Sequence, residues 1–120
     1  MGWLRRKKTY DRARLLNAAT RARKKGKRQK AIALYRQILA VEPNNPDLHR
    51  RIAPLLAEAK QRAAAWESYR RATDGLVRQG FVEKAVGVLR EASVQLPREP
   101  EVARLNELSD EKSGSLGGSP

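Results

Sequence analysis

The side chains best suited to binding chemistry in this 120-residue chain are cations gathered near one end. Residues 1–30 hold thirteen Lys and Arg against the single carboxylate of Asp11, which gives +12 of a total formal charge of +13. Basic stretches of this density are typical of segments that bind nucleic acid or an anionic membrane. The candidate contacts are Arg5, Arg6, Lys7, Lys8, Lys24, Lys25, Lys27 and Arg28.

Catalytic chemistry has no comparable set of residues. His49 is the only histidine, and a general base needs partners within hydrogen-bond reach. The absence of cysteine excludes a disulfide framework, a thiolate nucleophile and a cysteine zinc site. The acidic residues are scattered among cations, and the glycines of residues 114–118 precede no helix that could form a phosphate loop. We therefore expect no enzyme, no cofactor and no metal.

The elements that must position these residues are helices. Apolar residues recur at spacings of three and four, and the expected helices cover residues 10–25, 28–41, 46–58, 61–79 and 82–96. A short sixth helix is expected after Pro97. Pro54 predicts a kink or an early end in the third helix, because proline removes a backbone hydrogen bond. Asp74-Gly75 marks a place where the fourth helix could break.

The predicted helices form one domain with a different composition at each end. Residues 1–9 are expected to be a basic arm, residues 10–108 the helical domain, and residues 109–120 a flexible Gly/Ser-rich tail. No apolar run approaches the ~18 residues of a membrane span. Charged residues at positions 11, 12 and 14 replace the apolar stretch of a secretory signal. A cytoplasmic location is expected.

The helical pattern repeats. Ala31, Tyr35 and Ile38 recur 34 residues later as Ala65, Tyr69 and Ala72, and a third copy follows after a further 20 residues with Ala85, Leu89 and Ala92. With the Gly26 and Gly80 turns and the Pro43 and Pro97 stops, this pattern resembles the tetratricopeptide repeat, a 34-residue pair of antiparallel helices. The resemblance covers about residues 12–97. It implies an all-α, tetratricopeptide-like fold of five or six antiparallel helices, with the fourth shared between two units.

The resemblance also implies a binding surface. Members of this family commonly bind extended peptides or partner helices along a concave face built mainly from first helices. The corresponding residues of this chain are Asn17, Thr20, Arg50, Arg51, Arg70 and Arg71. Four of them are arginines, whose guanidinium groups bind carboxylates in bidentate fashion. We therefore expect a non-catalytic adaptor or scaffold that binds an acidic segment of another protein, and solvated surface arginines are the alternative.

The basic end supports two rival expectations. Nucleic acid would be bound through residues 5–8 and 21–30, with an affinity that falls steeply with salt. An anionic membrane would instead be bound by the arm, with Trp3 and Leu4 entering the headgroup region. A third alternative is that the cations of the arm only aid solubility. An exposed end helix of a repeat array can also pair with a copy of itself, so a homodimer is left open.

Overall fold

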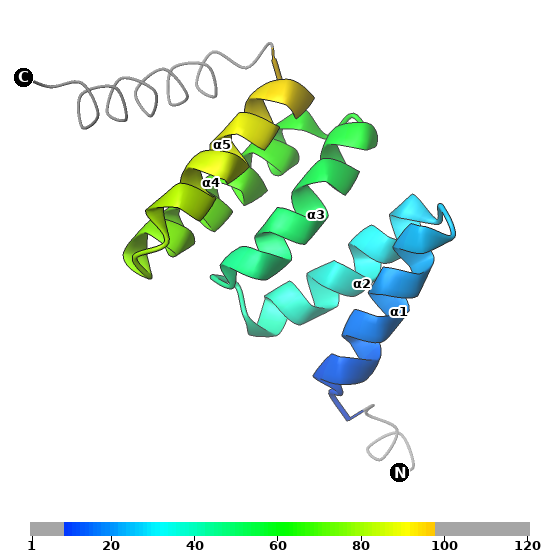
Figure 1. The fold of residues 1–120 in the computed structure, drawn as a ribbon. Helices are drawn as coiled ribbons and strands as arrows, with labels where there is room; N and C mark the ends of the chain where they lie inside the picture. Colours follow the sequence, from blue (N-terminus) through cyan, green and yellow to red (C-terminus); the bar gives the residue numbers. More distant parts are fainter. Residues whose placement is uncertain (1–8, 98–120) are drawn as a thin grey trace, which may run out of the picture.

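A computed structural model describes residues 9–97 of the chain, and this part is built from helices and short turns (Figure 1). The all-α fold predicted from the sequence is confirmed. The helices are antiparallel to their neighbours along the chain and are α1 (Arg12–Lys24), α2 (Arg28–Val41), α3 (Pro46–Glu58), α4 (Arg62–Arg78) and α5 (Val82–Gln95). Residues 1–8 of the expected arm, the sixth helix and the Gly/Ser tail lie outside the described residues.

The helix ends follow from local chemistry. Asp11 caps α1 by accepting a hydrogen bond from the backbone N–H of Arg14 at 3.1 Å, and Asn45 caps α3 through the N–H of Leu48 at 3.1 Å. Pro46 occupies the first turn of α3, where its missing N–H costs nothing. The observed bounds of α2 and α3 match the predicted ranges of 28–41 and 46–58.

One turn geometry occurs three times. The turns after α1, α3 and α4 each contain a residue with a left-handed backbone: Gly26 at φ +76°, Lys60 at +66° and Gly80 at +87°. In each turn the next backbone N–H donates to the carbonyl five residues earlier, over 2.8–2.9 Å, which is the Schellman arrangement. These turns are spaced by 34 and then 20 residues, the same intervals as the repeated sequence pattern.

Helices α3 and α4 both continue past the places where the sequence suggested a possible break. The third helix does not end early, because α3 continues for a full turn beyond Pro54 to Glu58. Buried residues on both sides of the proline, Ala53 and Leu55, hold this stretch against its neighbours. The fourth helix is unbroken, because α4 runs through Asp74-Gly75 to Arg78. Tertiary packing therefore overrides the local helix propensity at both places.

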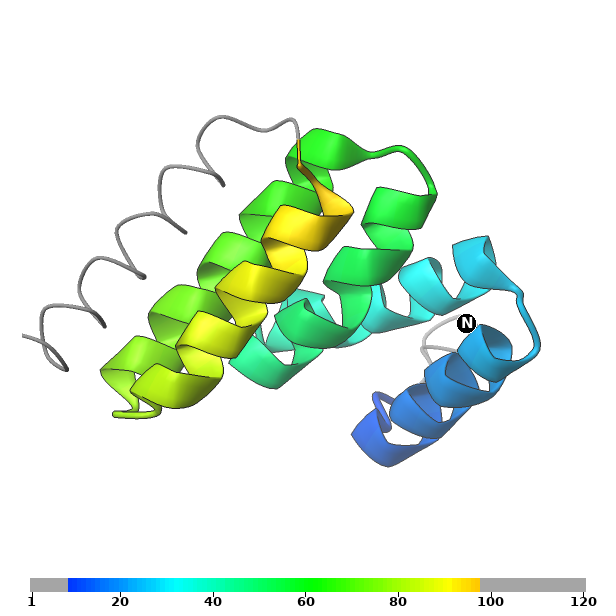
Figure 2. The same ribbon diagram turned by 45° about the horizontal axis from the view of Figure 1, so that its top comes forward.

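The core extends across the whole array. Helix α3 lies between α2 and the pair formed by α4 and α5, while α1 packs against α2 (Figures 1 and 2). Tyr35 and Tyr69 are fully buried between the helices. The small residues at the predicted close contacts, Ala31, Ala65 and Ala85, are also buried, which allows close helix approach. No helix among residues 9–97 is both long enough and apolar enough to cross a membrane.

Candidate functional site

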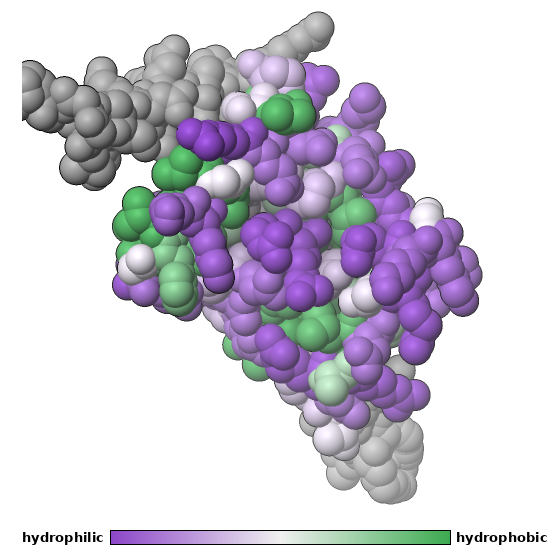
Figure 3. All heavy atoms as spheres, viewed as in Figure 1, coloured by the Kyte–Doolittle hydropathy of each residue, from purple (hydrophilic) through white to green (hydrophobic). Residues whose placement is uncertain are grey.

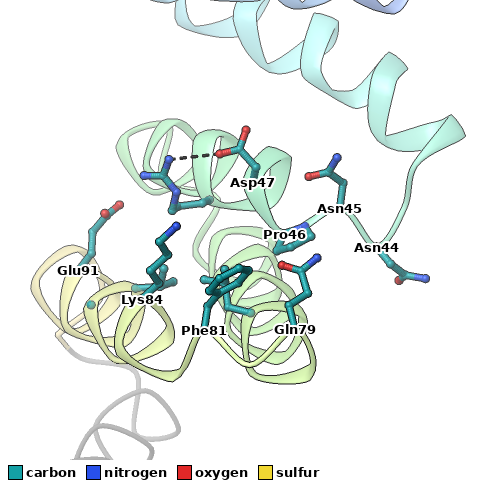
Figure 4. A pocket seen from close by; sticks show the side chains of 12 residues that line it. Asn44, Asn45, Pro46, Asp47, Gln79, Phe81, Lys84 and Glu91 are labelled. Carbon is teal, nitrogen blue, oxygen red and sulfur yellow. Dashed lines mark hydrogen bonds and ion pairs between the residues drawn. The ribbon is translucent and has the colours of Figure 1, made fainter.

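An open groove of about 750 Å³ lies where the beginning of α3 faces the end of α4 and the first half of α5. Figure 4 shows its walls: Asn44 and Asn45 come from the turn before α3, Gln79 from the end of α4, and Phe81 and Lys84 from α5 and the turn before it. A groove of this size can hold several side chains of a bound peptide. It is therefore the main candidate binding site in the described part of the chain.

The groove is lined in part by apolar side chains. Val88 is buried and Leu76 is partly buried, whereas Phe81 remains 48% exposed at the start of α5. Figure 3 shows apolar residues gathered on the surface near the turn that joins α4 to α5. The ammonium group of Lys84 lies 4.8 Å from the centroid of the Phe81 ring, a cation–π contact. A bound segment could therefore bury an apolar side chain against Phe81.

Charged groups of both signs complete the lining. Arg50 donates to Asp47 over 3.2 Å (dashed in Figure 4). Glu91 accepts a hydrogen bond of 2.9 Å from the hydroxyl of Tyr69. Burial and then the Glu91 carboxylate raise the pKa of Tyr69, so its hydroxyl keeps its proton and fixes the position of that carboxylate. Two cations thus face two carboxylates, and the groove has no net formal charge.

A buried histidine holds one wall of the groove in place. His49 Nε2 lies 2.7 Å from the carbonyl oxygen of Pro43, and Nδ1 lies 3.3 Å from the Ser68 hydroxyl. Because a carbonyl can only accept, Nε2 carries the hydrogen and Nδ1 accepts from Ser68. Burial lowers the pKa of His49 and Arg71 lowers it further, against the opposing effects of the Pro43 carbonyl and Glu67. His49 therefore fastens the α2–α3 turn to α4.

The arginines predicted as one binding surface divide between two helices. Arg50 lines the groove, and Arg51 on the same helix donates to Asp47 over 2.8 Å. Arg70 and Arg71 lie on α4, where they pair with Glu67 over 2.8 and 2.7 Å. The buried residues of α4 are Ala65, Trp66, Ser68, Tyr69, Ala72 and Gly75. Arg70 is half-buried, Arg71 is exposed, and neither lines the groove.

The two polar residues predicted on α1 also lie away from the groove lining. Asn17 is exposed, and the Thr20 hydroxyl donates to the carbonyl of Leu16 on its own helix over 2.9 Å. Of the six residues expected to bind a partner, only Arg50 lines the groove. Among the predicted basic contacts, Lys24, Lys25, Lys27 and Arg28 are exposed around the α1–α2 turn, and residues 5–8 lie outside the described part.

Sequence reasoning missed the other eleven residues of the groove lining, among them Phe81, Lys84 and Glu91. Lys84 and Glu91 face the groove only because α5 packs beside α3, a relation that the helical period does not contain. Phe81 did carry a signal, since it is the only phenylalanine and directly follows the Gly80 turn. An aromatic residue next to a turn glycine, one position before the apolar run of a helix, is a candidate for an exposed anchor.

Comparisons with known proteins identify no family for this chain. No protein-family model matches the chain, and no curated protein matches it. Within residues 9–97 no group of three or more His, Asp or Glu side chains is placed to hold a metal ion. The groove itself is thus the basis for a functional conclusion.

Proposed function

We propose that this chain is a non-catalytic protein-interaction module that binds a short segment of a partner protein in the groove between α3 and α5. One observation carries the proposal: the groove combines the exposed Phe81 ring with a border of charged groups and carboxamides. Binding sites of this kind bury an apolar anchor and use a few polar groups to orient the ligand. The carboxamides of Asn44 and Gln79 can both donate to and accept from a peptide backbone.

The chemistry of the groove favours a segment with an apolar anchor and a nearby carboxylate. Lys84 has an aromatic contact but no ion pair within the described part of the chain, so a partner carboxylate can approach it. Arg50 is already paired with Asp47, and exposed pairs of this kind contribute only about 0–1 kcal/mol, so the pair can be exchanged for a partner carboxylate at little cost. An acidic partner segment remains part of the proposal, with Lys84 and Arg50 as its contacts.

The resemblance to tetratricopeptide repeats supports the same function. Three equivalent turns at the repeat intervals and buried alanines at the equivalent helix contacts agree with a repeat array. An adaptor or scaffold role and a cytoplasmic location belong to this proposal.

The test begins with short random peptides displayed on phage and selected on the immobilised full chain. Peptides that bind are then measured against Phe81→Ser and Val94→Ser by fluorescence anisotropy. Val94 is the matched control, because it is also an exposed apolar residue of the α5 region, at 76% exposure, but it does not line the groove. We expect Phe81→Ser to weaken binding at least about tenfold, since burial of a Phe side chain contributes about 1.5–3 kcal/mol.

The control variant is expected to bind like the unmodified chain. Circular dichroism should show equal helix content in both variants, because each change is made at an exposed position. Equal loss of affinity in the two variants, or no loss in Phe81→Ser, would exclude the groove as the binding site.

A further inference from the structure

A second surface lies at the turn between α1 and α2, and we name residues 21–30 the basic tip. Seven of its ten residues are Lys or Arg and none is acidic. All seven cations are exposed. Arg28 pairs with Glu58 at the end of α3 over 3.7 Å, and no other ion pair involves the tip within the described part of the chain. Six neighbouring cations therefore lack a carboxylate partner there.

The fold does not require this charge. The turns at Lys60 and Gly80 have the same left-handed residue and the same backbone hydrogen bonds as the turn at Gly26. Around Lys60 the chain has Glu58, and around Gly80 it has Glu83 and the apolar Phe81. An equivalent turn thus forms with mixed charge at two other places, so the turn itself does not require seven cations.

The charges at the start of α2 are also electrostatically unfavourable in isolation. Helix α2 begins at Arg28 with Lys27 before it, has no side-chain cap and has no acidic residue in its first turn. Its first backbone N–H groups and the positive end of its dipole therefore add to the field of Lys27, Arg28 and Lys30, whereas the negative end of the α1 dipole stabilises Arg21, Arg23 and Lys24. Like charges held this close repel one another, and a bound polyanion would remove that repulsion.

The tip has the chemistry of a phosphate-binding surface without an apolar or aromatic component. The large exposed apolar residues of the described part are Tyr10, Val41, Val77, Phe81, Val82 and Val94, all outside the tip. Insertion into a membrane interface needs apolar side chains beside the cations. Binding to single strands relies on aromatic side chains that stack on bases. Binding to the backbone of a regular duplex requires only cations, because the phosphates lie on the outside of the duplex.

We propose that the basic tip binds the phosphate backbone of a nucleic-acid duplex without regard to sequence. This activity is separate from the groove, because the tip contacts the end of α3 through Glu58 whereas the groove lies at its beginning. The thirteen residues of α3 place the two surfaces about 20 Å apart along its axis. One chain can therefore bind a duplex and a protein segment at the same time.

The experiment measures binding of the full chain to a short mixed-sequence DNA duplex by fluorescence anisotropy, between about 50 and 200 mM salt. The tip variant is Lys24→Gln/Lys25→Gln/Lys27→Gln. The first control is Arg70→Gln/Arg71→Gln/Arg78→Gln on α4, and the second is Arg5→Gln/Arg6→Gln/Lys7→Gln. Each triple variant changes the formal net charge from +13 to +10 by removing three cations.

The tip variant is expected to weaken duplex binding at least about tenfold near 100 mM salt. The slope of the logarithm of the binding constant against the logarithm of the salt concentration should become shallower by about 2–3, since each phosphate contact contributes about 0.9 to that slope. Neither control should weaken binding more than about threefold, and a second duplex of unrelated sequence should bind equally. Equal loss in all three variants would show a net-charge effect and overturn the proposal. Loss confined to the residue 5–7 variant, or tip-dependent binding to phosphatidylserine vesicles without duplex binding, would also overturn it.

Discussion

At the scale of single residues, His49 links the stability of the fold to pH. Both ring nitrogens are engaged, and burial lowers the pKa below its ordinary value of about 6.5. A folded-state pKa below the unfolded one means that the unfolded chain binds more protons. The stability contributed by neutral His49 is therefore complete above pH ~6.5 and is lost as pH falls from there through the folded-state pKa.

We predict that the free energy of unfolding falls as the pH is lowered from about 7.5 to 5, and that His49→Gln removes most of this dependence. Ordinary carboxylates contribute little in this window, because ~pH 5 still lies above their pKa values. Urea denaturation at several pH values checks this. His49 is the only histidine, so no other imidazole contributes in this window. Arg71 and Glu67 face the ring with opposite charges, and burial remains the main cause. An unchanged pH dependence in His49→Gln would contradict the account.

At the scale of helices, Gly75 lets α4 approach the beginning of α3. A Cβ at this position would lie 3.0 Å from Pro46 Cβ, and the proline ring cannot rotate away because it is closed onto its own backbone. Gly87 in α5 offers a matched contrast, since a Cβ there would meet nothing within 4 Å. Both glycines lie inside a helix, but only Gly75 is required by the packing of its neighbours.

These two glycines give opposite predictions for the same substitution. Gly87→Ala is expected to raise the free energy of unfolding by about 1 kcal/mol, the difference in helix propensity between Gly and Ala. Gly75→Ala loses that gain to overpacking, which costs about 1–3 kcal/mol. Denaturant unfolding of both variants checks this. An equal gain in both would show that α3 and α4 are not in close contact at Pro46.

The helices themselves could be predicted well from the sequence, because their signals are local. Gly26, Asn45-Pro46 and Gly80 are turn and cap residues whose chemistry acts within a few positions, and α2 and α3 match their predicted ranges. The turn at Lys60 lacks a glycine, and its place follows from the 34-residue interval after Gly26. Of the two outcomes predicted at Pro54, the early end does not occur, because the buried neighbours that keep α3 intact belong to tertiary structure.

At the scale of the whole molecule, the sequence could not show which helix faces meet. It placed Arg50, Arg51, Arg70 and Arg71 on one surface, whereas only Arg50 lines the groove and the two α4 arginines pair with Glu67 away from its lining. A helical period fixes the faces of one helix but carries no information on how two helices are placed against each other. The groove depends on that placement, because residues 44–50 and 76–91 meet only in the folded array.

The assembled molecule presents two different surfaces from one helical array. The groove has no net formal charge and contains an exposed aromatic ring, and the basic tip holds only cations and small or polar residues. Their positions at the two ends of α3 would separate the proposed protein binding from the proposed phosphate binding. The central claim is that the groove, rather than the arginine face of α4, binds the partner segment.

The most direct measurement of that claim is an NMR titration of the isotope-labelled full chain with a selected peptide. The account predicts that backbone amide shifts concentrate in residues 44–50 and 79–91, on both sides of the groove. Shifts concentrated instead around Glu67, Arg70 and Arg71 would place the peptide at the arginines of α4, outside the groove, and contradict the account.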